Sequence, residues 1–340
     1  RAMLKVLHVT RDAHLPSADA PAGGLERAVH ELVKAQRAVG IDASVVGPDV
    51  KGTLPEANVV HAHDWYAQPC AERYFRAGLR AIVVTSHLPV RRGFTYRDTG
   101  HAWNEKLQME AQLFDLAAAI VAPSSFAASF LSTEYGMARD RLHVIAHGVD
   151  AGVFRPPAQG RSTNGAVHVI TASRVTAQKG VELFLRTVPY VAAHISQFHA
   201  TIVGDGDALP ACKRLAERLG ISERIAFRHA VPAKQLADIY ASASLLVMPS
   251  LFEPFGLAGL EALACGCPVL AIRPTGADYL HSGELTDSCS PARLARAIVA
   301  RLHDDSRDGA SRESLRERAL RWPWDRAARL SAELYAAVMQ

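Results

Sequence analysis

The chain has 340 residues, of which 49% are hydrophobic, and a formal net charge of +4. A chain of this length exceeds the size at which one hydrophobic core stops growing, so we expect two domains. The small net charge argues against a nucleic-acid-binding protein and is compatible with an anionic ligand.

The cysteines and the hydropathy pattern indicate the cellular compartment of the protein. The five cysteines are too few and too scattered for a disulfide framework: Cys70, Cys212, Cys265, Cys267 and Cys289. Cys265 and Cys267 have no second Cys or His pair nearby at zinc spacing, so we do not expect them to bind metal. The sequence shows no signal-peptide pattern and no apolar run of the roughly 20 residues that a membrane helix needs. We expect a cytoplasmic protein without a transmembrane segment and leave peripheral membrane contact open.

Short apolar runs alternate with segments of helical spacing along the chain. The first half predicts a helix at 25–39 and strands within 4–10, 43–46, 58–65, 81–87 and 118–125. A stretch rich in Pro, Gly and Ser, residues 151–166, indicates an interdomain linker. The second half predicts strands within 167–174, 200–206, 225–231 and 245–248. This alternation predicts an α/β protein with two doubly wound domains.

Polar residues stand at the carboxyl ends of two strands expected in the first half, where ligands gather in open α/β sheets. His61, His63 and Asp64 end one strand, and His87 ends the next. His61, His63 and Asp64 resemble a metal cluster. Both histidines stand at the end of one strand, however, and no third ligand stands at a spacing typical of metal sites, so we favour a site without metal. A single histidine such as His87 is by itself more often structural. The pair Gly23-Gly24 is by itself a turn, since no G-x-G-x-x-G pattern stands there.

In the second half, Arg174 and Lys179 stand five residues apart across a loop before a helix. Two cations at a helix start suit a diphosphate, because backbone amides supply dipoles and the side chains supply charge. Further on, the strand at 245–248 leads into a loop with Glu253 and then a small-residue helix with Glu261. We expect both glutamates to face one cleft, and Gly256 and Gly259 to leave room for a ligand.

The string Glu253-Pro254-Phe255-Gly256-Leu257, followed by Glu261-Ala262-Leu263-Ala264 and Gly266, resembles the Glu-x7-Glu signature of the retaining glycosyltransferases of family 4. The resemblance covers nearly the whole chain. It implies a GT-B fold, in which two Rossmann-like domains face a cleft and a C-terminal helix crosses back to the first domain. We therefore expect a first domain at 1–152, a linker at 153–166, a nucleotide-sugar-binding domain at 167–322 and the returning helix at 323–340.

The resemblance also implies roles in the first domain. Gly23-Gly24-Leu25-Glu26 is similar to a loop that lies against the donor phosphates and the acceptor. His61-Ala62-His63-Asp64-Trp65 resembles a string of the related glycogen and starch synthases, which places Asp64 beside the transferred sugar. Thr85-Ser86-His87 resembles the family's Thr-x-His, whose histidine contacts the sugar near its reacting carbon. His147 stands where relatives carry asparagine.

For the second domain the resemblance implies the donor site. Arg174 and Lys179 would clamp the diphosphate, Glu253 would hold sugar hydroxyls and Glu261 would hold the ribose hydroxyls. Further donor contacts are expected from the glycines of Val203-Gly204-Asp205-Gly206, from the backbone near the base and from the start of the Glu261 helix: Gly204, Gly206, Val231, Phe255, Gly256 and Leu257. Ser173 replaces a usual glycine, and Thr275-Gly276 stands where relatives carry a glycine pair.

We therefore predict a retaining transfer of a hexose-type sugar from a nucleoside-diphosphate donor to a small-molecule or glycan hydroxyl. UDP-sugars are the commonest donors in the family, and ADP- or GDP-sugars stay open. No Asp-x-Asp motif stands out, so we expect neither a metal nor a cofactor. A GT-B phosphorylase or sugar-nucleotide epimerase is the alternative, and a non-enzymatic sugar-nucleotide-binding subunit is a third reading.

Overall fold

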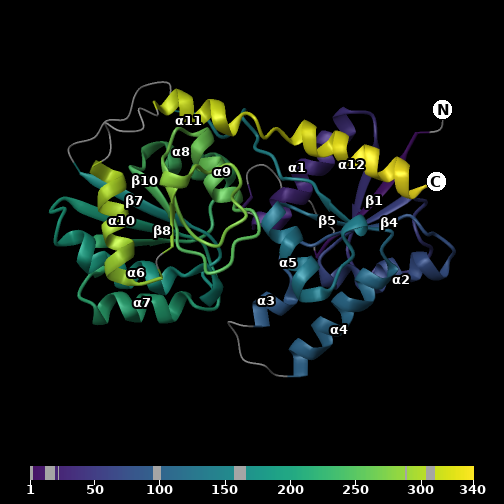
Figure 1. Cartoon of the computed structure of the whole chain (residues 1–340), viewed down its shortest axis with the longest axis horizontal. Helices are drawn as coiled ribbons and strands as arrows, with labels where there is room; N and C mark the ends of the chain where they lie inside the picture. The colour runs from purple at the N-terminus through teal and green to yellow at the C-terminus, as the bar shows by residue number, and fades with distance from the viewer. Residues whose placement is uncertain are drawn as a thin grey trace. The chain divides into compact units, whose positions relative to one another are not determined.

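The computed structural model describes residues 3–11, 20, 21, 23–94, 101–156, 166–287, 289–303 and 311–340. These residues divide into two compact units (Figure 1). The first unit comprises the described residues of 1–16, 25–148 and 323–340, and the second those of 17–24 and 149–322.

The division differs from the expected domains at two places. The first unit ends at Gly148 rather than at residue 152, because the amide of Val149 donates to the carbonyl of Trp322 at 2.9 Å and the Arg316 guanidinium donates to the carbonyls of Ala151 and Phe154. The described residues of 17–24 group with the second unit. Residues 157–165 of the expected linker lie outside the described residues.

The first unit contains a sheet of six parallel strands. Its strands are β1 (Lys5–Val9), β2 (Asp42–Val46), β3 (Val59–His63), β4 (Ile82–Thr85), β5 (Ala119–Ala122) and β6 (Leu142–Val144). Their order is β2-β1-β3-β4-β5-β6, so the chain reverses its winding direction between β1 and β3. Such a switch point leaves a crevice at the carboxyl ends of the two strands.

Helices accompany this sheet. They are α1 (Gly24–Ala38), α2 (Gln68–Arg76), α3 (Val90–Phe94), α4 (His101–Leu116), α5 (Ser125–Tyr135) and α12 (Trp324–Val338), with short 3₁₀ turns η1 (Trp65–Ala67) and η2 (Arg139–Arg141). Helix α5 begins where the Ser124 hydroxyl accepts from the Ala127 amide at 3.0 Å, and ends at Gly136, whose φ is +66°. The apolar faces of α2, α4 and α5 form one core with the sheet.

The last helix, α12, packs within the first unit beside α1, at the yellow end of the colour range in Figure 1. Its Tyr335 is fully buried and hydrogen-bonds Gln36 of α1. At its start, Gly148 lies against the backbone of Trp324 so closely that a Cβ there would overlap it. The C-terminal end of the chain is therefore part of the first unit.

The second unit contains a second sheet of six parallel strands. They are β7 (Val167–Ala172), β8 (Phe198–Val203), β9 (Ile225–Arg228), β10 (Leu245–Met248), β11 (Val269–Ile272) and β12 (Leu285–Thr286). The order β12-β11-β10-β7-β8-β9 is the arrangement of a dinucleotide-binding Rossmann sheet and places the switch point between β7 and β10. The doubly wound folding predicted for both halves is thus confirmed.

Helices and 3₁₀ turns connect these strands: η3 (Ala177–Lys179), α6 (Val181–Ala192), α7 (Leu209–Arg218), η4 (Ser222–Arg224), α8 (Ala233–Ser242), α9 (Leu257–Ala264), η5 (Ser282–Glu284), α10 (Pro291–His303) and α11 (Arg312–Ala319). Helix α9 packs on α8 and α11 and is buried along most of its length, which explains its small and apolar sequence. The chain turns into β11 after Gly266, whose φ is +71°.

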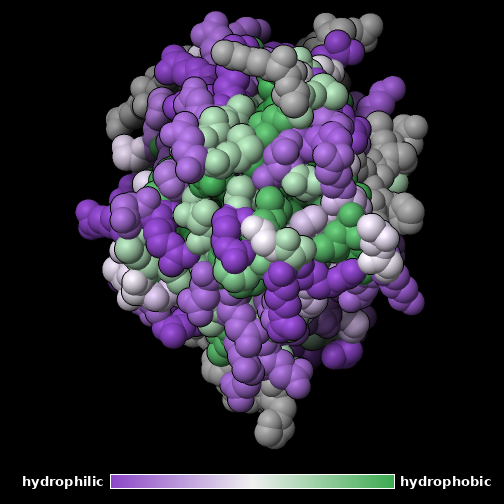
Figure 2. Space-filling view, turned by 90° about the vertical axis from the view of Figure 1, so that its right-hand side faces the viewer, coloured by the Kyte–Doolittle hydropathy of each residue, from purple (hydrophilic) through white to green (hydrophobic). Residues whose placement is uncertain are grey.

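Figure 2 shows hydrophilic residues over most of the face that it views, with hydrophobic patches between them. Among the described residues, no helix is both long and apolar enough to span a membrane.

Candidate functional site

The candidate residues gather at the carboxyl ends of the strands that flank the two switch points. In the first unit, His8 lies on β1 and His61 and His63 lie on β3, with His8 directly opposite His61 in the parallel register. In the second unit, Arg174 follows β7 and Glu253 follows β10. Each unit therefore has a candidate site where an open α/β sheet binds its ligand.

Lys179 and Glu253 form the central contact of the second unit's site. The ammonium Nζ donates to Glu253 Oε2 at 2.7 Å, and the Ser250 hydroxyl donates to the same oxygen at 2.9 Å. Both side chains are nearly buried, with 15% and 11% of their surfaces exposed. The pair is well shielded from water, so its attraction is stronger than that of a surface ion pair.

The loop that carries Lys179 is locked to the loop that carries Glu253. The Leu251 amide donates to the Gln178 carbonyl at 2.9 Å, and the Gln178 side chain donates to the Phe252 carbonyl at 3.0 Å. Gly180 has φ +67°, and a Cβ there would overlap the Pro249 carbonyl. Only glycine combines this backbone conformation with so close an approach, which explains the Lys-Gly sequence.

Gly204 and Gly206 lie against the loop of Arg174. A Cβ at Gly204 would overlap the Ser173 carbonyl, and a Cβ at Gly206 would overlap the Val175 carbonyl. These glycines fix the backbone that presents Arg174, whose side chain is exposed and has no hydrogen bond to another described residue. A guanidinium in this position is available to an anionic ligand.

Asp205, between these glycines, positions the segment before Val231. Its carboxylate accepts from the Ala230 amide at 2.8 Å and contacts His229 Nδ1 at 2.5 Å. The Ala230 amide, and then His229, hold the pKa of Asp205 below its usual value. Val231 lies three residues beyond the end of β9 and directly follows Ala230, whose amide this carboxylate holds.

Glu261 is buried, with 3% of its surface exposed, and the Tyr240 hydroxyl approaches its carboxylate at 3.5 Å. Tyr279, which the sequence analysis did not select, donates to the carbonyl of Gly256. Burial first, and then the charges of Glu253 and Glu261, raise the pKa of Tyr279. Both carboxylates thus lie near one phenol, as expected for glutamates on one side of the site.

One expectation about this segment was wrong. Gly256 and Gly259 do not leave open space, because a Cβ at Gly256 would overlap the Met248 methyl and one at Gly259 would come within 2.5 Å of the Tyr279 hydroxyl. Protein side chains fill the space beside both glycines. Gly256 is the N-cap of α9 at φ +82°, with no side-chain cap, and Leu257 is the first residue of the helix. Phe255 packs edge-to-face on Tyr279 and Trp322.

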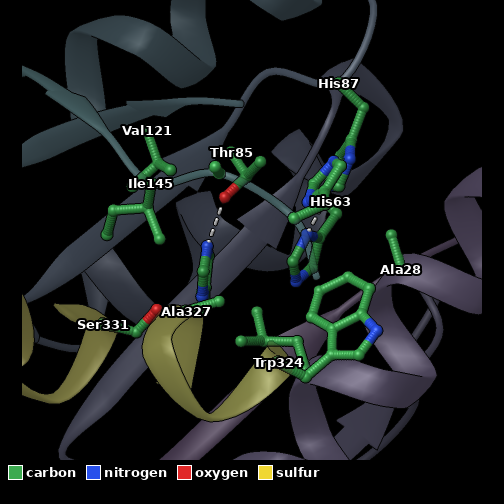
Figure 3. Close-up of a pocket in the computed structure, with 13 residues that line it drawn as sticks. Ala28, His63, Thr85, His87, Val121, Ile145, Trp324, Ala327 and Ser331 are labelled. Atoms are coloured by element: carbon green, nitrogen blue, oxygen red, sulfur yellow. Dashed lines mark hydrogen bonds between the residues drawn. The ribbon is translucent and has the colours of Figure 1, made fainter. Parts of the chain in front are cut away.

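The first unit's site is a chain of hydrogen-bonded histidines. His8 Nδ1 lies 2.9 Å from His63 Nε2, and His63 Nδ1 lies 2.9 Å from His87 Nε2. His61 Nε2 lies 2.6 Å from the Thr85 hydroxyl, and Figure 3 shows this bond as a dashed line. The sequence analysis missed His8, although a histidine within an apolar strand is itself a signal of a buried polar network.

His147 completes this group. Its ring stacks on His87, with centroids 5.1 Å apart and planes at 18°. Its other neighbour is Trp324, the first residue of α12, at a centroid distance of 5.7 Å. The histidine that stands where relatives carry asparagine therefore supports His87 by stacking.

Asp64 holds the backbone of His87. Its Oδ1 accepts from the His87 amide at 2.7 Å and from the Leu88 amide at 3.3 Å. Asp64 itself has φ +58°, which is uncommon for a residue other than glycine and often marks a functional position. Gly23 immediately precedes α1 and Gly24 is the first residue of this helix, with nothing within 4 Å of an added Cβ.

Glu110 of α4 anchors the segment that follows His87. Both carboxylate oxygens accept from the Val90 amide, at 3.0 and 3.1 Å, and the Tyr135 hydroxyl donates to Oε2 at 2.5 Å. Burial raises the pKa of Glu110 to about 8, although the hydrogen bonds oppose this shift. No motif in the sequence predicts this role for Glu110.

The histidines are neutral. Burial lowers the pKa of His8 and of His147 to about 4 each. Burial and neighbouring imidazoles lower the pKa of His61, His63 and His87 well below the usual value. A cavity of about 20 Å³ borders His61, His63, His87, His147 and Trp324. It has room for about one water molecule.

His8, His61 and His63 also have ligand atoms within 4.8 Å of one another and could hold a metal ion. This is a different trio from His61, His63 and Asp64, which were considered and for which a site without metal was predicted, and His8 supplies the ligand whose absence had argued against metal. Each of the six ring nitrogens already has a protein partner. The residues thus fit a hydrogen-bonded network at least as well as an ion.

Two solved structures share this fold. Sucrose-phosphate synthase from Thermosynechococcus elongatus superimposes with a TM-score of 0.81 over 98% of both chains at 20% identity. The Anabaena protein HepE, solved with UDP-glucose, gives a TM-score of 0.77 over 98% of this chain and 100% of the other at 19% identity. The two doubly wound sheets are therefore those of the GT-B glycosyltransferase fold.

Two family models match the sequence itself. Residues 56–153 match the model described as Glycosyltransferase Family 4, and residues 166–304 match the one described as Glycosyl transferases group 1. The chain belongs to this family of glycosyltransferases, as the Glu-x7-Glu resemblance predicted.

Two curated relatives are both named as D-inositol 3-phosphate glycosyltransferases. D-inositol 3-phosphate glycosyltransferase 1 of Catenulispora acidiphila is 29% identical over 307 residues, covering 83% of this chain and 73% of that protein. D-inositol 3-phosphate glycosyltransferase of Streptomyces bingchenggensis is 33% identical over 252 residues, covering 68% of this chain and 55% of that protein. The chain thus spans only about half the length of the second relative.

Proposed function

We propose that the chain transfers a hexose-type sugar, with retention of configuration, from a nucleoside-diphosphate donor to a hydroxyl of a small molecule. The support is family membership and the Lys179–Glu253 pair beside Arg174 at the β7/β10 switch point. A UDP-sugar is the favoured donor, because the fold is shared with a protein solved with UDP-glucose. An inositol phosphate is the first acceptor to test, because relatives are named for it.

Charge stabilisation drives the proposed reaction. As the bond between the anomeric carbon and the diphosphate oxygen breaks, negative charge grows on the leaving group. Arg174, exposed at the end of β7, and Lys179 supply positive charge, and the first amides of α9 supply oriented dipoles. Lys179 is held by Glu253 without donor, so the diphosphate would share or take over this ammonium.

Retention needs no protein nucleophile in this scheme. The acceptor oxygen forms its bond to the anomeric carbon on the face from which the diphosphate leaves. The acceptor hydroxyl gives its proton to a departing phosphate oxygen, which balances the exchange. His87 would contact the donor sugar near the reacting carbon, and Glu253 its hydroxyls, while Glu261 would hold the ribose. We propose that no divalent metal takes part.

The test begins with thermal shifts. UDP, ADP and GDP are compared, each with its sugar, because a ligand that binds only the folded state raises its stability by mass action. Release of free nucleoside diphosphate is then measured with and without inositol phosphate and related acceptors. Acceptor-dependent release supports the transferase. Release without acceptor, or a shift without any release, would contradict it and favour an epimerase, a phosphorylase or a binding subunit.

A further inference from the structure

We propose that a buried hydrogen-bonded chain, running from Tyr335 through Gln36, His8 and His63, fixes the tautomer that His87 offers to the donor sugar. Gln36 and Tyr335 would then be positioning residues, far from His87 in sequence. Only the contact between His87 and a donor sugar rests on the proposed function. The tautomers themselves are a property of the unliganded protein.

The chain is continuous and closely spaced. The Gln36 side-chain amide donates to the Tyr335 hydroxyl at 2.9 Å, and its Oε1 lies 2.7 Å from His8 Nε2. His8 and His63 are then linked at 2.9 Å, as are His63 and His87. The first four residues are fully buried, which removes water as a competing partner. Figure 3 shows His63 and His87, the last two residues of the chain of hydrogen bonds.

Neutral imidazoles make such a chain directional. A neutral ring has one nitrogen that donates and one that accepts, so fixing one end fixes every ring that follows. Gln36 Oε1 is an acceptor, so His8 Nε2 must carry the proton and its Nδ1 must accept. His63 Nε2 then donates to His8, and His87 Nε2 donates to His63. His87 Nδ1 is left without a proton.

A second branch supports the same direction. The Tyr335 hydroxyl accepts from Gln36 and lies 2.6 Å from His61 Nδ1, to which its single proton can be donated. His61 Nε2 must then carry a proton, which it donates to the Thr85 hydroxyl at 2.6 Å. No donor faces a donor in either branch, and the Ser331 side chain is a further hydrogen-bond partner of the Tyr335 hydroxyl. Reversing the direction would require the amide to turn over and every ring to change tautomer together.

The chain ends at an atom suited to a sugar. His87 Nδ1 has no hydrogen-bond partner among the described residues. Without a proton, it accepts from a hydroxyl group, and hydroxyls are what a hexose presents on all sides. The opposite tautomer would present an N–H there instead. The Gln36 amide therefore decides, through His8 and His63, which hydrogen bond His87 makes with the ligand.

A metal ion bound by His8, His61 and His63 is the alternative interpretation of this histidine cluster. It would break the bonds that link these rings and leave Gln36 and Thr85 without histidine partners. It would also place a divalent charge among fully buried side chains with no carboxylate among the three ligands. The hydrogen-bonded network is therefore favoured, and the metal becomes one outcome of the test.

The first measurement is a nitrogen–proton correlation spectrum of ¹⁵N-histidine-labelled protein, which separates protonated from bare ring nitrogens. Assignments come from single His-to-Gln substitutions. We expect His8, His61, His63 and His87 all to carry their proton on Nε2. Protonated Nδ1 at His87, or equal mixtures in the wild type, would overturn the proposal. Stoichiometric zinc or another transition metal in the purified protein that is lost in His8→Gln would also overturn it.

The second measurement uses Tyr335→Phe and Gln36→Met, which keep the buried volume but cut the chain. We expect mixed tautomers at His87 and a rise in KM for the sugar donor of about 2- to 10-fold, in proportion to the fraction of the wrong tautomer. The affinity for free nucleoside diphosphate should not change. Tyr74→Phe is the matched control, because Tyr74 is a buried tyrosine of the same unit whose hydroxyl donates to the Pro55 carbonyl at 2.7 Å.

These results separate the two proposals. If the tautomers are as expected but no sugar donor binds or reacts, the proposed function fails while the network stands. If the wild type turns over donor and Tyr335→Phe changes neither the His87 tautomer nor the donor KM, the positioning role fails while the function stands. A uniform loss of folding, seen as a lowered melting temperature in Tyr335→Phe alone, is resolved by Gln36→Met, which must also show the mixed tautomers.

Discussion

The two switch points of this protein are built from opposite chemistry. The first unit gathers five buried or half-buried histidines, all neutral, around the carboxyl ends of β1, β3 and β4. The second unit gathers ions there: Lys179 paired with Glu253, and the exposed Arg174. The same sheet architecture therefore supports two kinds of site.

Burial explains the difference. A charge removed from water is costly unless it is paired, so the ammonium of Lys179 is kept with a carboxylate. The first unit instead uses neutral rings whose donors and acceptors satisfy one another. Neutral groups suit uncharged sugar hydroxyls, and cations suit a diphosphate. The predictions below test this contrast, from the largest expected effect to the smallest.

The largest effect should be a selective loss of stability of the first unit in acid. The pKa of each of the five histidines is lowered in the folded state, to about 4 for His8 and His147, so only the unfolded chain takes up protons between about pH 6.5 and 4. The stability that the neutral histidines contribute is thus complete above about pH 6.5 and falls as the pH decreases through this window. Each histidine contributes up to about 1.4 kcal/mol per pH unit.

Glu110 acts in the opposite sense. Its pKa, raised to about 8, means that the folded state binds the extra proton, which offsets about one histidine over the same interval. The net loss in the free energy of unfolding between about pH 7 and 5 should still be several kcal/mol by this reasoning. Hydrogen exchange, corrected for its intrinsic pH dependence, should show β1, β3 and β4 losing protection before β7 and β10. Equal loss in both units would contradict the contrast.

The next effect concerns the ionic site. Lys179→Ala should lower turnover at least about a hundredfold, because it removes a preorganised charge from the leaving diphosphate. Lys234→Ala, at an exposed position of α8, is the control and should retain the wild-type rate. A melting curve of each variant checks that Glu253, left without its cation, does not unfold the site. Wild-type turnover in Lys179→Ala would refute the role of this residue.

A smaller effect should follow from Gly206→Ala. The new Cβ would overlap the Val175 carbonyl, so the loop that presents Arg174 must move, at a cost of about 1–3 kcal/mol. Thermal unfolding measures the loss. Gly24→Ala is matched to it, because nothing lies within 4 Å of an added Cβ there, and its melting temperature should stay within about a degree or two of the wild type. Equal melting temperatures for the two variants would show that the loop yields freely.

The smallest effect should come from chelation. If lysine, arginine and helix amides alone neutralise the leaving group, EDTA should change the transfer rate less than about twofold, since no charge at the site is removed. Added Mg²⁺ or Mn²⁺ should have equally little effect. Loss of activity with EDTA that Mg²⁺ restores would end the proposal of metal independence, while leaving the assignment of Lys179 to be judged by its own variant.

Much of this arrangement was visible in the sequence. The alternation of apolar runs predicted two doubly wound halves, and Arg174, Lys179, Glu253 and Glu261 were the residues predicted for an ionic site. The approximate course of most strands was also predicted. The apparent openness beside Gly256 and Gly259 was not real, because Met248 and Tyr279 occupy it from elsewhere in the second unit.

The sequence by itself determined the fold class, the family and the charged groups, because these depend on local periodicity and on residues that are close along the chain. Only the tertiary structure decided that His8 joins His63, that His147 stacks on His87 and that Tyr335 binds Gln36, 299 residues away. Parallel strand pairing and the return of α12 bring these side chains together. Their partners follow from the order of strands in the sheet, which no spacing in the sequence records.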